Sequence, residues 1–374
     1  MRFLHTGDWH IGKKLHGYDL LADQKAVIRQ IFVLAKQEKV DAIVIAGDLY
    51  DRSVPSVEAC EMLNQLFIEI NWQEKIPVLA ISGNHDSAVR LSTGMPWYEL
   101  TDFHLYTKLE QSFDPIEIGD VQFYLLAYFE PVAARAYFHD DSLTLTTAIK
   151  KIIGQMGKSF DPGKKQVLVT HFFIAGSFKT DSETSVEVGG LNAISYDLLH
   201  TFDYVALGHL HSKNAIKKGN ARYSGSPLKF SLSEKDDQKG IWIIDSSDLN
   251  PQFKALTPLR DVKELVASFR QLTDPDFYQQ LNCEDFWQFQ LTDRTIIPNM
   301  MNQLRAIYPN IIGAQRISRY RENVQLEKLK ERKNSPQQML QTFFAEITGD
   351  DLTKRQKYWL DQALLQATDT EKRG

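Results

Sequence analysis

The sequence is poor in cysteine and in long apolar runs, and both absences exclude classes of protein. Only two cysteines occur, Cys60 and Cys283, and they form no CxxC pair, which argues against a disulfide framework or a thiolate zinc site. No stretch approaches the roughly 18 to 20 consecutive apolar residues that a membrane span needs. Residues 1–5 turn polar at once, unlike the apolar core of a secretory signal. We therefore expect a cytoplasmic protein that makes no contact with a membrane.

The chain also has no excess of positive charge. The formal net charge is −5, which argues against a protein that coats nucleic acid through its overall charge, so any contact with nucleic acid must be local. Hydrophobic residues make up 43% of the chain and charged residues 24%, as in ordinary globular proteins. A chain of 374 residues is longer than one hydrophobic core usually serves, and this predicts one large domain with at least one smaller one.

Apolar runs of strand length recur along the first part of the chain, and the first three are separated by amphipathic helical patterns. Five runs predict buried strands, at 2–5, 42–46, 77–81, 167–169 and 204–207. Strands that alternate with helices indicate an α/β layered domain. Three alternating stretches, at 121–125, 221–223 and 240–244, predict further strands, which we expect to be antiparallel and to form a second sheet. The predicted fold is a two-sheet α/β sandwich flanked by helices.

The pattern changes beyond residue 245, where a polar turn cluster begins and strand ends with acidic residues no longer occur. We place a domain transition between about 250 and 275. Residues 316–333 hold seven basic residues against three acidic ones, as in an exposed linker. The predicted organisation has four parts: a catalytic domain at 1–255, a small β-α-β capping domain at 270–320, a basic linker at 321–334 and a helix-loop-helix tail at 335–374.

Polar side chains of metal-binding type follow each of the five predicted strands. In order, the strand ends carry Asp8-Trp9-His10, Gly47-Asp48-Leu49-Tyr50-Asp51, Gly83-Asn84-His85-Asp86, His171 and Gly208-His209-Leu210-His211. Carboxyl ends of strands in an α/β sheet meet where ligands bind, so these side chains should converge. Each motif alone has an ordinary explanation, since Gly-Asp is a common turn and a histidine after an apolar strand is often a satisfied core residue. All five together favour a metal site.

This order of motifs resembles the calcineurin-like metallophosphoesterase superfamily, and every element of that pattern is intact. The resemblance implies two ions with seven ligands: Asp8, His10 and His211 for one, Asn84, His171 and His209 for the other, and Asp48 between them. Carboxylate, amide and imidazole donors of this kind suit manganese, iron or zinc better than calcium. Two such ions would support in-line hydrolysis of a phosphate ester.

Three further residues of these motifs have expected roles beside the ions. His85 follows the ligand Asn84 and resembles the superfamily's transition-state histidine, which implies that it neutralises phosphate charge or protonates the leaving oxygen. Asp86 is expected to orient His85 in catalysis, with a plain surface carboxylate as the alternative. Asp51 is expected to orient a ligand histidine, and a direct catalytic role is in doubt because some relatives carry histidine there.

Longer segments narrow the substrate. The segments 12–24, 47–56, 82–87 and 223–234 closely resemble the family of bacterial SbcD nucleases, and the resemblance spans nearly the whole chain. It implies a DNA phosphodiesterase with two Mn²⁺ per chain, with Zn²⁺ or Fe²⁺ as alternatives at the same ligands. The implied activities are those of a double-strand exonuclease and a single-strand or hairpin endonuclease in DNA repair, recombination and replication. An SbcC-type ATPase partner and a homodimer are implied as well, and we expect an apolar dimer surface near residues 62–67.

Cations near the motifs and aromatic residues in the tail are the candidate contact points. Five basic residues would rim the site where a phosphate backbone must lie, although each is equally explained as a solvated surface residue: Lys13, Lys14, His16, Arg52 and Arg90. In the tail, Phe343, Phe344 and Trp359 are more aromatic surface than two short helices can bury against each other. We expect residues 335–374 to bind the ATPase partner, with packing on their own chain as the alternative.

Two other functions compete with a DNA nuclease. The same site would serve an enzyme that acts on a nucleotide, a phosphoprotein or another small phosphate ester. Such an enzyme has no need of the residues that follow the catalytic domain. A scaffold that has lost catalysis is the other alternative, and the complete set of ligands argues against it.

Overall fold

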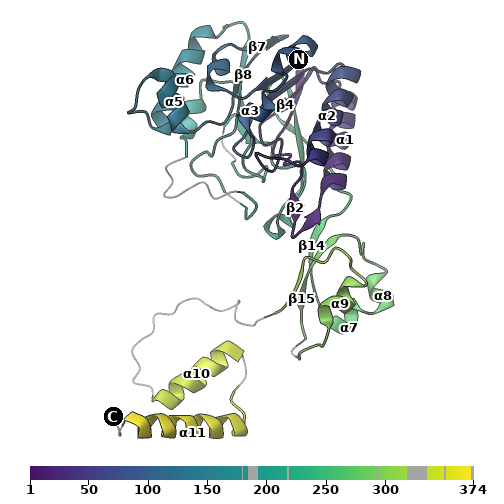
Figure 1. Cartoon of the computed structure of the whole chain (residues 1–374), viewed down its shortest axis with the longest axis vertical. Coiled ribbons are helices and arrows are strands. Elements are labelled where there is room, and N and C mark those ends of the chain that lie inside the picture. Colours follow the sequence, from purple (N-terminus) through teal and green to yellow (C-terminus); the bar gives the residue numbers. More distant parts are fainter. Residues whose placement is uncertain are drawn as a thin grey trace.

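Two stacked β-sheets with helices on their outer faces form the larger part of the protein, followed by a small sheet and a pair of helices (Figure 1). The structure is a computed structural model that describes residues 1–178, 180–183, 193–216, 219–293, 295–317, 335–348 and 351–371. Within these ranges no helix is both long enough and apolar enough to cross a membrane.

The first sheet carries the first three motifs at its strand ends. Its strand order is β13 (Gln252–Ala255), β12 (Gly240–Asp245), β1 (Arg2–Thr6), β4 (Ala42–Ile45), β5 (Val78–Ile81) and β6 (Phe103–Tyr106). The last four run parallel to one another, and β12 pairs antiparallel with β1. The strands predicted at 2–5, 42–46 and 77–81 are therefore confirmed, and their carboxyl ends lie at one edge of the sheet.

The second sheet carries the remaining two motifs. Its strand order is β11 (Ala221–Tyr223), β10 (Tyr204–Leu207), β9 (Lys165–Thr170), β8 (Val121–Leu126) and β7 (Ile116–Ile118). Two expectations were wrong. β11 runs parallel to β10, and β8 runs parallel to β9. In each pair the connection returns along the sheet, so both strands start from the same edge. β8 is antiparallel to β7. The strand at 240–244 is antiparallel as expected, but it belongs to the first sheet.

Three apolar cores hold these layers together. Between the sheets, Phe3 of β1 packs edge-on against Phe123 of β8, with ring centroids 5.2 Å apart. Outside the first sheet lie α1 (Leu21–Gln37) and α2 (Val57–Phe67), and outside the second lie α5 (Pro131–Phe138) and α6 (Leu145–Met156). Ser56 and Thr144 precede α2 and α6, and each side chain accepts a hydrogen bond from a backbone NH of the first turn, which fixes where the helix begins. Two single-turn helices, α3 (Ala88–Leu91) and α4 (Met95–Tyr98), follow the third motif.

The surface expected for a homodimer is part of the first core. Met62 of α2 is 9% exposed and Leu66 is fully buried, while Phe67 packs against the same core. Burying a side chain of this size contributes about 1.5–3 kcal/mol, so these residues stabilise the protein itself. The expectation that residues 62–67 offer an apolar surface was therefore wrong. Helical spacing places Met62, Leu63 and Leu66 on the face of α2 that meets the sheet.

A small parallel sheet follows the sandwich. It consists of β14 (Val262–Ala267), β15 (Phe286–Leu291) and β16 (Gly313–Arg316), with α7 (Phe269–Leu272), α8 (Pro275–Tyr278) and α9 (Met300–Arg305) in its connections. Its own core contains Leu272, Phe289, Leu304 and Tyr308. Within the range predicted for the small β-α-β domain, β15, α9 and β16 follow the expected order of strand, helix and strand. β14 adds a third strand from residues that the sequence assigned to the domain transition.

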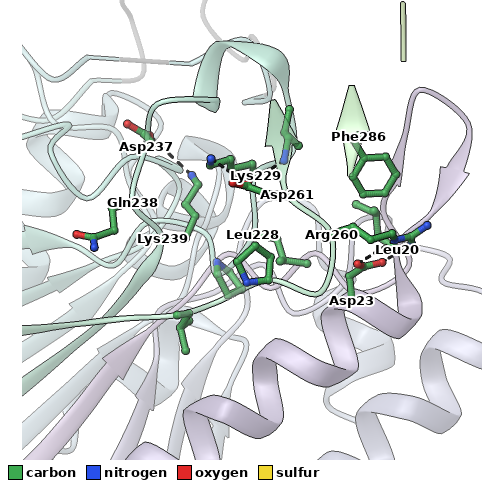
Figure 2. A pocket seen from close by; sticks show the side chains of 14 residues that line it. Leu20, Asp23, Leu228, Lys229, Asp237, Gln238, Lys239, Arg260, Asp261 and Phe286 are labelled. Atoms are coloured by element: carbon green, nitrogen blue, oxygen red, sulfur yellow. Dashed lines mark hydrogen bonds and ion pairs between the residues drawn. The ribbon is translucent and has the colours of Figure 1, made fainter. Parts of the chain in front are cut away.

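The small sheet is joined to the sandwich through α1 and a short hairpin of β2 (Lys14–Leu15) and β3 (Tyr18–Asp19). The hydroxyl of Tyr18 donates to the carbonyl of Ile311 at 2.9 Å, and Arg260 forms an ion pair with Asp23 of α1. Figure 2 shows this Arg260 pair at the margin of a cavity of about 160 Å³. Among the described residues that line the cavity there is none of the predicted metal ligands.

The last described elements are α10 (Pro336–Thr348) and α11 (Lys354–Glu371). The two predicted tail helices are confirmed, while the basic linker at 321–334 lies outside the described residues. Apolar side chains remain open to solvent on both helices: Phe343 is 58% exposed, Tyr358 61% and Trp359 55%.

Candidate metal centre

Loops at the ends of β1, β4 and β5 bring the first ligands together. The backbone NH of Asp8 donates to the carbonyl of Gly47 at 3.0 Å, and that of His10 donates to the carbonyl of Asp48 at 2.9 Å, so the loops run side by side. Asp8, His10 and Asp48 have φ angles of 51°, 44° and 50°. Residues other than glycine rarely adopt this left-handed region, and such backbone strain concentrates at functional sites.

The two sheets meet at these ligands. On one side, Nε2 of His10 lies 3.1 Å from Nε2 of His211. On the other side, Nε2 of His171 lies 3.1 Å from Oδ2 of Asp48. Oδ1 of Asn84 lies 3.1 Å from that same nitrogen of His171 and 2.9 Å from Nδ1 of His209. The structure thus brings all seven predicted ligands into one cluster, with Asp48 between its two halves.

The donor set fits divalent metal ions. Three groups of described residues have ligand atoms that all lie within 4.8 Å of one another: Asp8, His10 and His211; Asp8, Asp48 and His171; and His10, Asp51 and His85. Oδ2 of Asp8 is buried and has no hydrogen-bond partner in the described part of the chain. An unpaired buried carboxylate oxygen is costly unless a cation meets it. The first group is the set predicted for one ion, and Asp8 belongs to the second group as well.

Burial and mutual charge shift the acid–base behaviour of this cluster. Burial lowers the pKa of His10 to about 3, and it raises the pKa of Asp8 to about 8. Burial alone would lower the pKa of His171, but the carboxylates of Asp48 and Asp8 outweigh it and raise that pKa to about 9. A metal ligand must be a carboxylate or a neutral imidazole. Divalent ions that bind here would therefore displace protons from Asp8 and His171.

Two glycines allow the loops to approach so closely. A Cβ atom on Gly83 would overlap the carboxylate and backbone of Asp48, and one on Gly208 would overlap the carbonyl of Ala46. These glycines precede the ligands Asn84 and His209. Any larger residue would push a ligand loop of one strand away from its neighbour, so the glycines of the motifs are needed for close packing as well as for turns.

His85 stands beside the cluster in a defined orientation. Its Nδ1 lies 2.8 Å from the carbonyl oxygen of Asp51, and its backbone NH donates to Oδ1 of Asp48 at 2.9 Å. Because a carbonyl only accepts, Nδ1 must carry a proton. Its ring centroid lies 4.7 Å from that of His10. The carbonyl of Asp51 thus fixes the ring through Nδ1, and Nε2 is the nitrogen that would serve a substrate.

The structure gives Asp86 other partners than the expected one. Its carboxylate accepts hydrogen bonds from the backbone NH groups of Leu49, Tyr50 and Gly83, at 3.1, 3.0 and 2.9 Å. The first two belong to the loop of Asp48 and the third to the loop of Asn84. Asp86 thus joins two ligand loops, and the partner found for the His85 ring is the backbone of Asp51.

The side chain of Asp51 lies between a ligand and a predicted DNA contact. Its Oδ1 is 3.7 Å from Nδ1 of His10 and 2.8 Å from Nζ of Lys13. Lys13 is thus held in an ion pair, with 16% of its side chain exposed. The other four cations predicted to meet DNA are exposed at the surface: Lys14, His16, Arg52 and Arg90.

Several residues that support the ligands were missed as site residues. Gln24 of α1 donates to the carbonyl of His10 at 2.6 Å and accepts from the NH of Gly12 at 3.0 Å, which fixes the first ligand loop. Ser182 and Glu183 touch the ring and the backbone of His211. The family-like segment 12–24 contains Gln24, so this residue had a signal in the sequence. Ser182 and Glu183 belong to none of the strand-end motifs.

Comparisons with known proteins agree with this geometry. A family model described as calcineurin-like phosphoesterase matches residues 1–213, and one described as type 5 capsule protein repressor C-terminal domain matches residues 256–348. The SbcD subunit of the nuclease SbcCD from Staphylococcus epidermidis is 35% identical over 95% of this chain and 96% of its own length. The corresponding protein from Staphylococcus saprophyticus is 31% identical over 97% of this chain and 98% of its own length.

Proposed function

Because the chain belongs to the family of SbcD nucleases, within the calcineurin-like phosphoesterases, we propose that it is a manganese-dependent DNA nuclease that acts with an SbcC-type ATPase. The observation that carries this proposal is the convergence of the seven predicted ligand side chains from five strand ends, with His85 beside them. The chain is an enzyme, a metal-dependent phosphodiesterase. Double-strand exonuclease and single-strand or hairpin endonuclease activities are the proposed forms of its reaction.

In this proposal Asp8, His10 and His211 would hold one ion, Asn84, His171 and His209 would hold the other, and Asp48 would contribute to both. Two divalent ions would supply the Lewis acidity that in-line hydrolysis of a phosphodiester needs.

His85 is the proposed proton donor to the leaving oxygen. The carbonyl of Asp51 accepts from Nδ1 and so holds the ring in one orientation. When the ring is an imidazolium, Nε2 carries the proton that the leaving oxygen needs. Asp86 acts in this scheme by holding the loops of Asp48 and Asn84 at a fixed separation.

Metal preference and substrate class are tested together. With Mn²⁺ the purified protein should cleave circular single-stranded DNA, and with Mg²⁺ it should cleave it poorly, because Mg²⁺ dehydrates reluctantly and disfavours imidazole ligands. Nucleotides and aryl phosphomonoesters, assayed in parallel with Mn²⁺, should be poor substrates. Activity on these small esters without cleavage of DNA would favour the alternative enzyme. No activity on any of them, with two ions bound, would favour a scaffold.

The tail is the proposed tether to the ATPase partner. Phe343, Tyr358 and Trp359 leave most of their side chains open to solvent, although α10 and α11 contact each other through Gln337 and Asp361. Met339, which is 61% exposed, lies four residues before Phe343 on α10, and apolar residues at this spacing are the anchors by which an amphipathic helix binds an apolar groove. A coiled coil at the base of the ATPase would offer such a groove.

We also propose a homodimer, with a contact surface other than residues 62–67. Val57, Ile68 and Trp72 lie on or directly after α2 and are 69%, 45% and 57% exposed. They present an apolar surface that the core does not use. Trp72→Asp should convert a dimer into monomers in sedimentation experiments at micromolar concentration. Wild-type protein that sediments as a monomer at that concentration would contradict the dimer itself.

A further inference from the structure

A chain of buried hydrogen bonds lies behind the candidate ligand His211. Oγ of Ser182 lies 2.6 Å from Nδ1 of His211 and donates to Oε1 of Glu234 at 2.5 Å. Glu234 is fully buried, and Nζ of Lys239 donates to its other oxygen at 2.5 Å. The same ammonium group donates to the carbonyl of His211 at 2.8 Å. The ring and the backbone of this ligand are thus both connected to one buried ion pair.

The direction of these hydrogen bonds fixes the proton on the ring. A serine hydroxyl has one proton, and the carboxylate of Glu234 can only accept it. Oγ of Ser182 therefore accepts from His211, so Nδ1 of the ring carries the proton. Nε2 is left with a free electron pair, and it faces Nε2 of His10 at 3.1 Å. A metal-binding imidazole needs that arrangement, in which the nitrogen away from the ion is the donor.

The neighbouring residue holds the backbone of the same ligand. Oε1 of Glu183 accepts from the NH of His211 at 2.7 Å. Glu234 also accepts from the hydroxyl of Ser231 at 3.0 Å and from the NH of Phe230 at 3.2 Å. A buried ion pair is often no more stable than apolar side chains of the same size, so stability alone does not explain this one. Its position behind a single imidazole indicates that it orients the ring.

We propose that Ser182 is a positioning residue for His211. It connects Nδ1 of the ring to the buried carboxylate of Glu234, and this connection holds the tautomer and orientation that leave Nε2 free for an ion. This inference rests on the proposed function, because it takes His211 as a metal ligand. Ser182 contacts neither the ions nor the substrate in this scheme and acts only through the ring.

Metal binding tests the proposal without an activity assay. Mn²⁺ titrated calorimetrically into the metal-free full-length protein should bind to Ser182→Ala about 10- to 100-fold more weakly at one of two sites, the usual cost of losing a residue that orients a ligand. Ser182→Thr keeps the hydroxyl and should bind nearly as the wild type does. Unchanged binding by Ser182→Ala, or equal loss in both variants, would overturn the proposal.

Ser233 provides a matched control. Its hydroxyl accepts from the backbone NH of Asp181 at 3.0 Å and so holds the same segment from its exposed side. Ser233→Ala removes that support and leaves the Ser182 hydroxyl in place, so Mn²⁺ binding should stay at the wild-type level. If Ser233→Ala loses as much affinity as Ser182→Ala, the segment is merely a structural support and the positioning role is wrong.

The tautomer itself can be observed in the wild-type protein, and a variant is needed only to assign the signals. In metal-free protein with ¹⁵N-labelled histidine, the signals absent from His211→Ala identify this ring, and they should show a proton on Nδ1. A proton on Nε2 would overturn the proposal. If His211→Ala still binds two ions, the ligand assignment under the proposed function fails. If it loses an ion while Ser182→Ala loses no affinity, only the role of Ser182 fails.

Discussion

His85→Ala is expected to lower the turnover of DNA by about 10²- to 10⁴-fold, the range for a lost general acid, and to leave two ions bound. The ring donates through Nδ1 to the carbonyl of Asp51, and alanine keeps the backbone NH that donates to Asp48. The ligands therefore stay in place while the proton for the leaving oxygen is lost. Single-turnover rates and elemental analysis of the same preparation measure the two effects separately.

Substrates with different leaving groups show whether His85 donates a proton or only binds the phosphate. A phosphodiester with a good leaving group, such as bis-p-nitrophenyl phosphate, needs little protonation, so His85→Ala should slow it far less than it slows DNA. His209→Ala should instead lose metal, and His200→Ala, at an exposed histidine outside the site, should match the wild type. Loss of metal by His85→Ala to the same degree as by His209→Ala would show that the division between ligand and acid is wrong.

Deletion of residues 335–374 is expected to abolish co-purification with the ATPase partner and to leave manganese-dependent cleavage of single strands unchanged. The deletion removes α10 and α11 and none of the predicted ligands, which all precede residue 212. Cleavage of double-stranded DNA with ATP should be lost along with the partner. The comparison requires both proteins to be co-expressed, with one of them tagged.

Point variants test whether the exposed aromatic residues are the anchors. Phe343→Ala and Trp359→Ala should each weaken the complex by about tenfold or more, as expected when a buried aromatic anchor is truncated. Lys357→Ala, at an exposed position on the same helix as Trp359, is the matched control and should bind as the wild type does. A truncated chain that still co-purifies at full strength would show that the main contact lies elsewhere.

The strands that carry ligands were predictable because each is a short apolar run followed at once by polar residues. β1, β4, β5, β9 and β10 are fully or almost fully buried, so their sequences show no alternation that would disguise them. Pairing was harder to predict. The pattern of 240–244 predicts a strand but does not encode its neighbour, and only the structure places it beside β1.

The contacts within the site were also not encoded in the local sequence. Ligands could be assigned because a resemblance fixed their order, whereas their supports are determined by contacts distant in sequence. Asp86 follows His85 directly, yet its carboxylate accepts from backbone groups of residues 49, 50 and 83. Lys13 lies beside the first motif, yet it is paired with Asp51 from the second. Neighbours in sequence were taken as partners, and the folded loops provided different ones.

The antiparallel partner of β1 has a consequence for how the protein is made. β1 is completed with the first few residues of the chain, but β12, which covers its free edge, ends only at Asp245. While the ribosome synthesises the residues between them, β1 presents an unpaired edge that holds Phe3 and Leu4, both fully buried in the final fold. Such an edge is a template for aggregation. The matched phosphoesterase region, 1–213, contains every predicted ligand but lacks β12. A fragment that ends at residue 213 would therefore have the complete set of predicted ligands and still leave the edge of β1 unpaired.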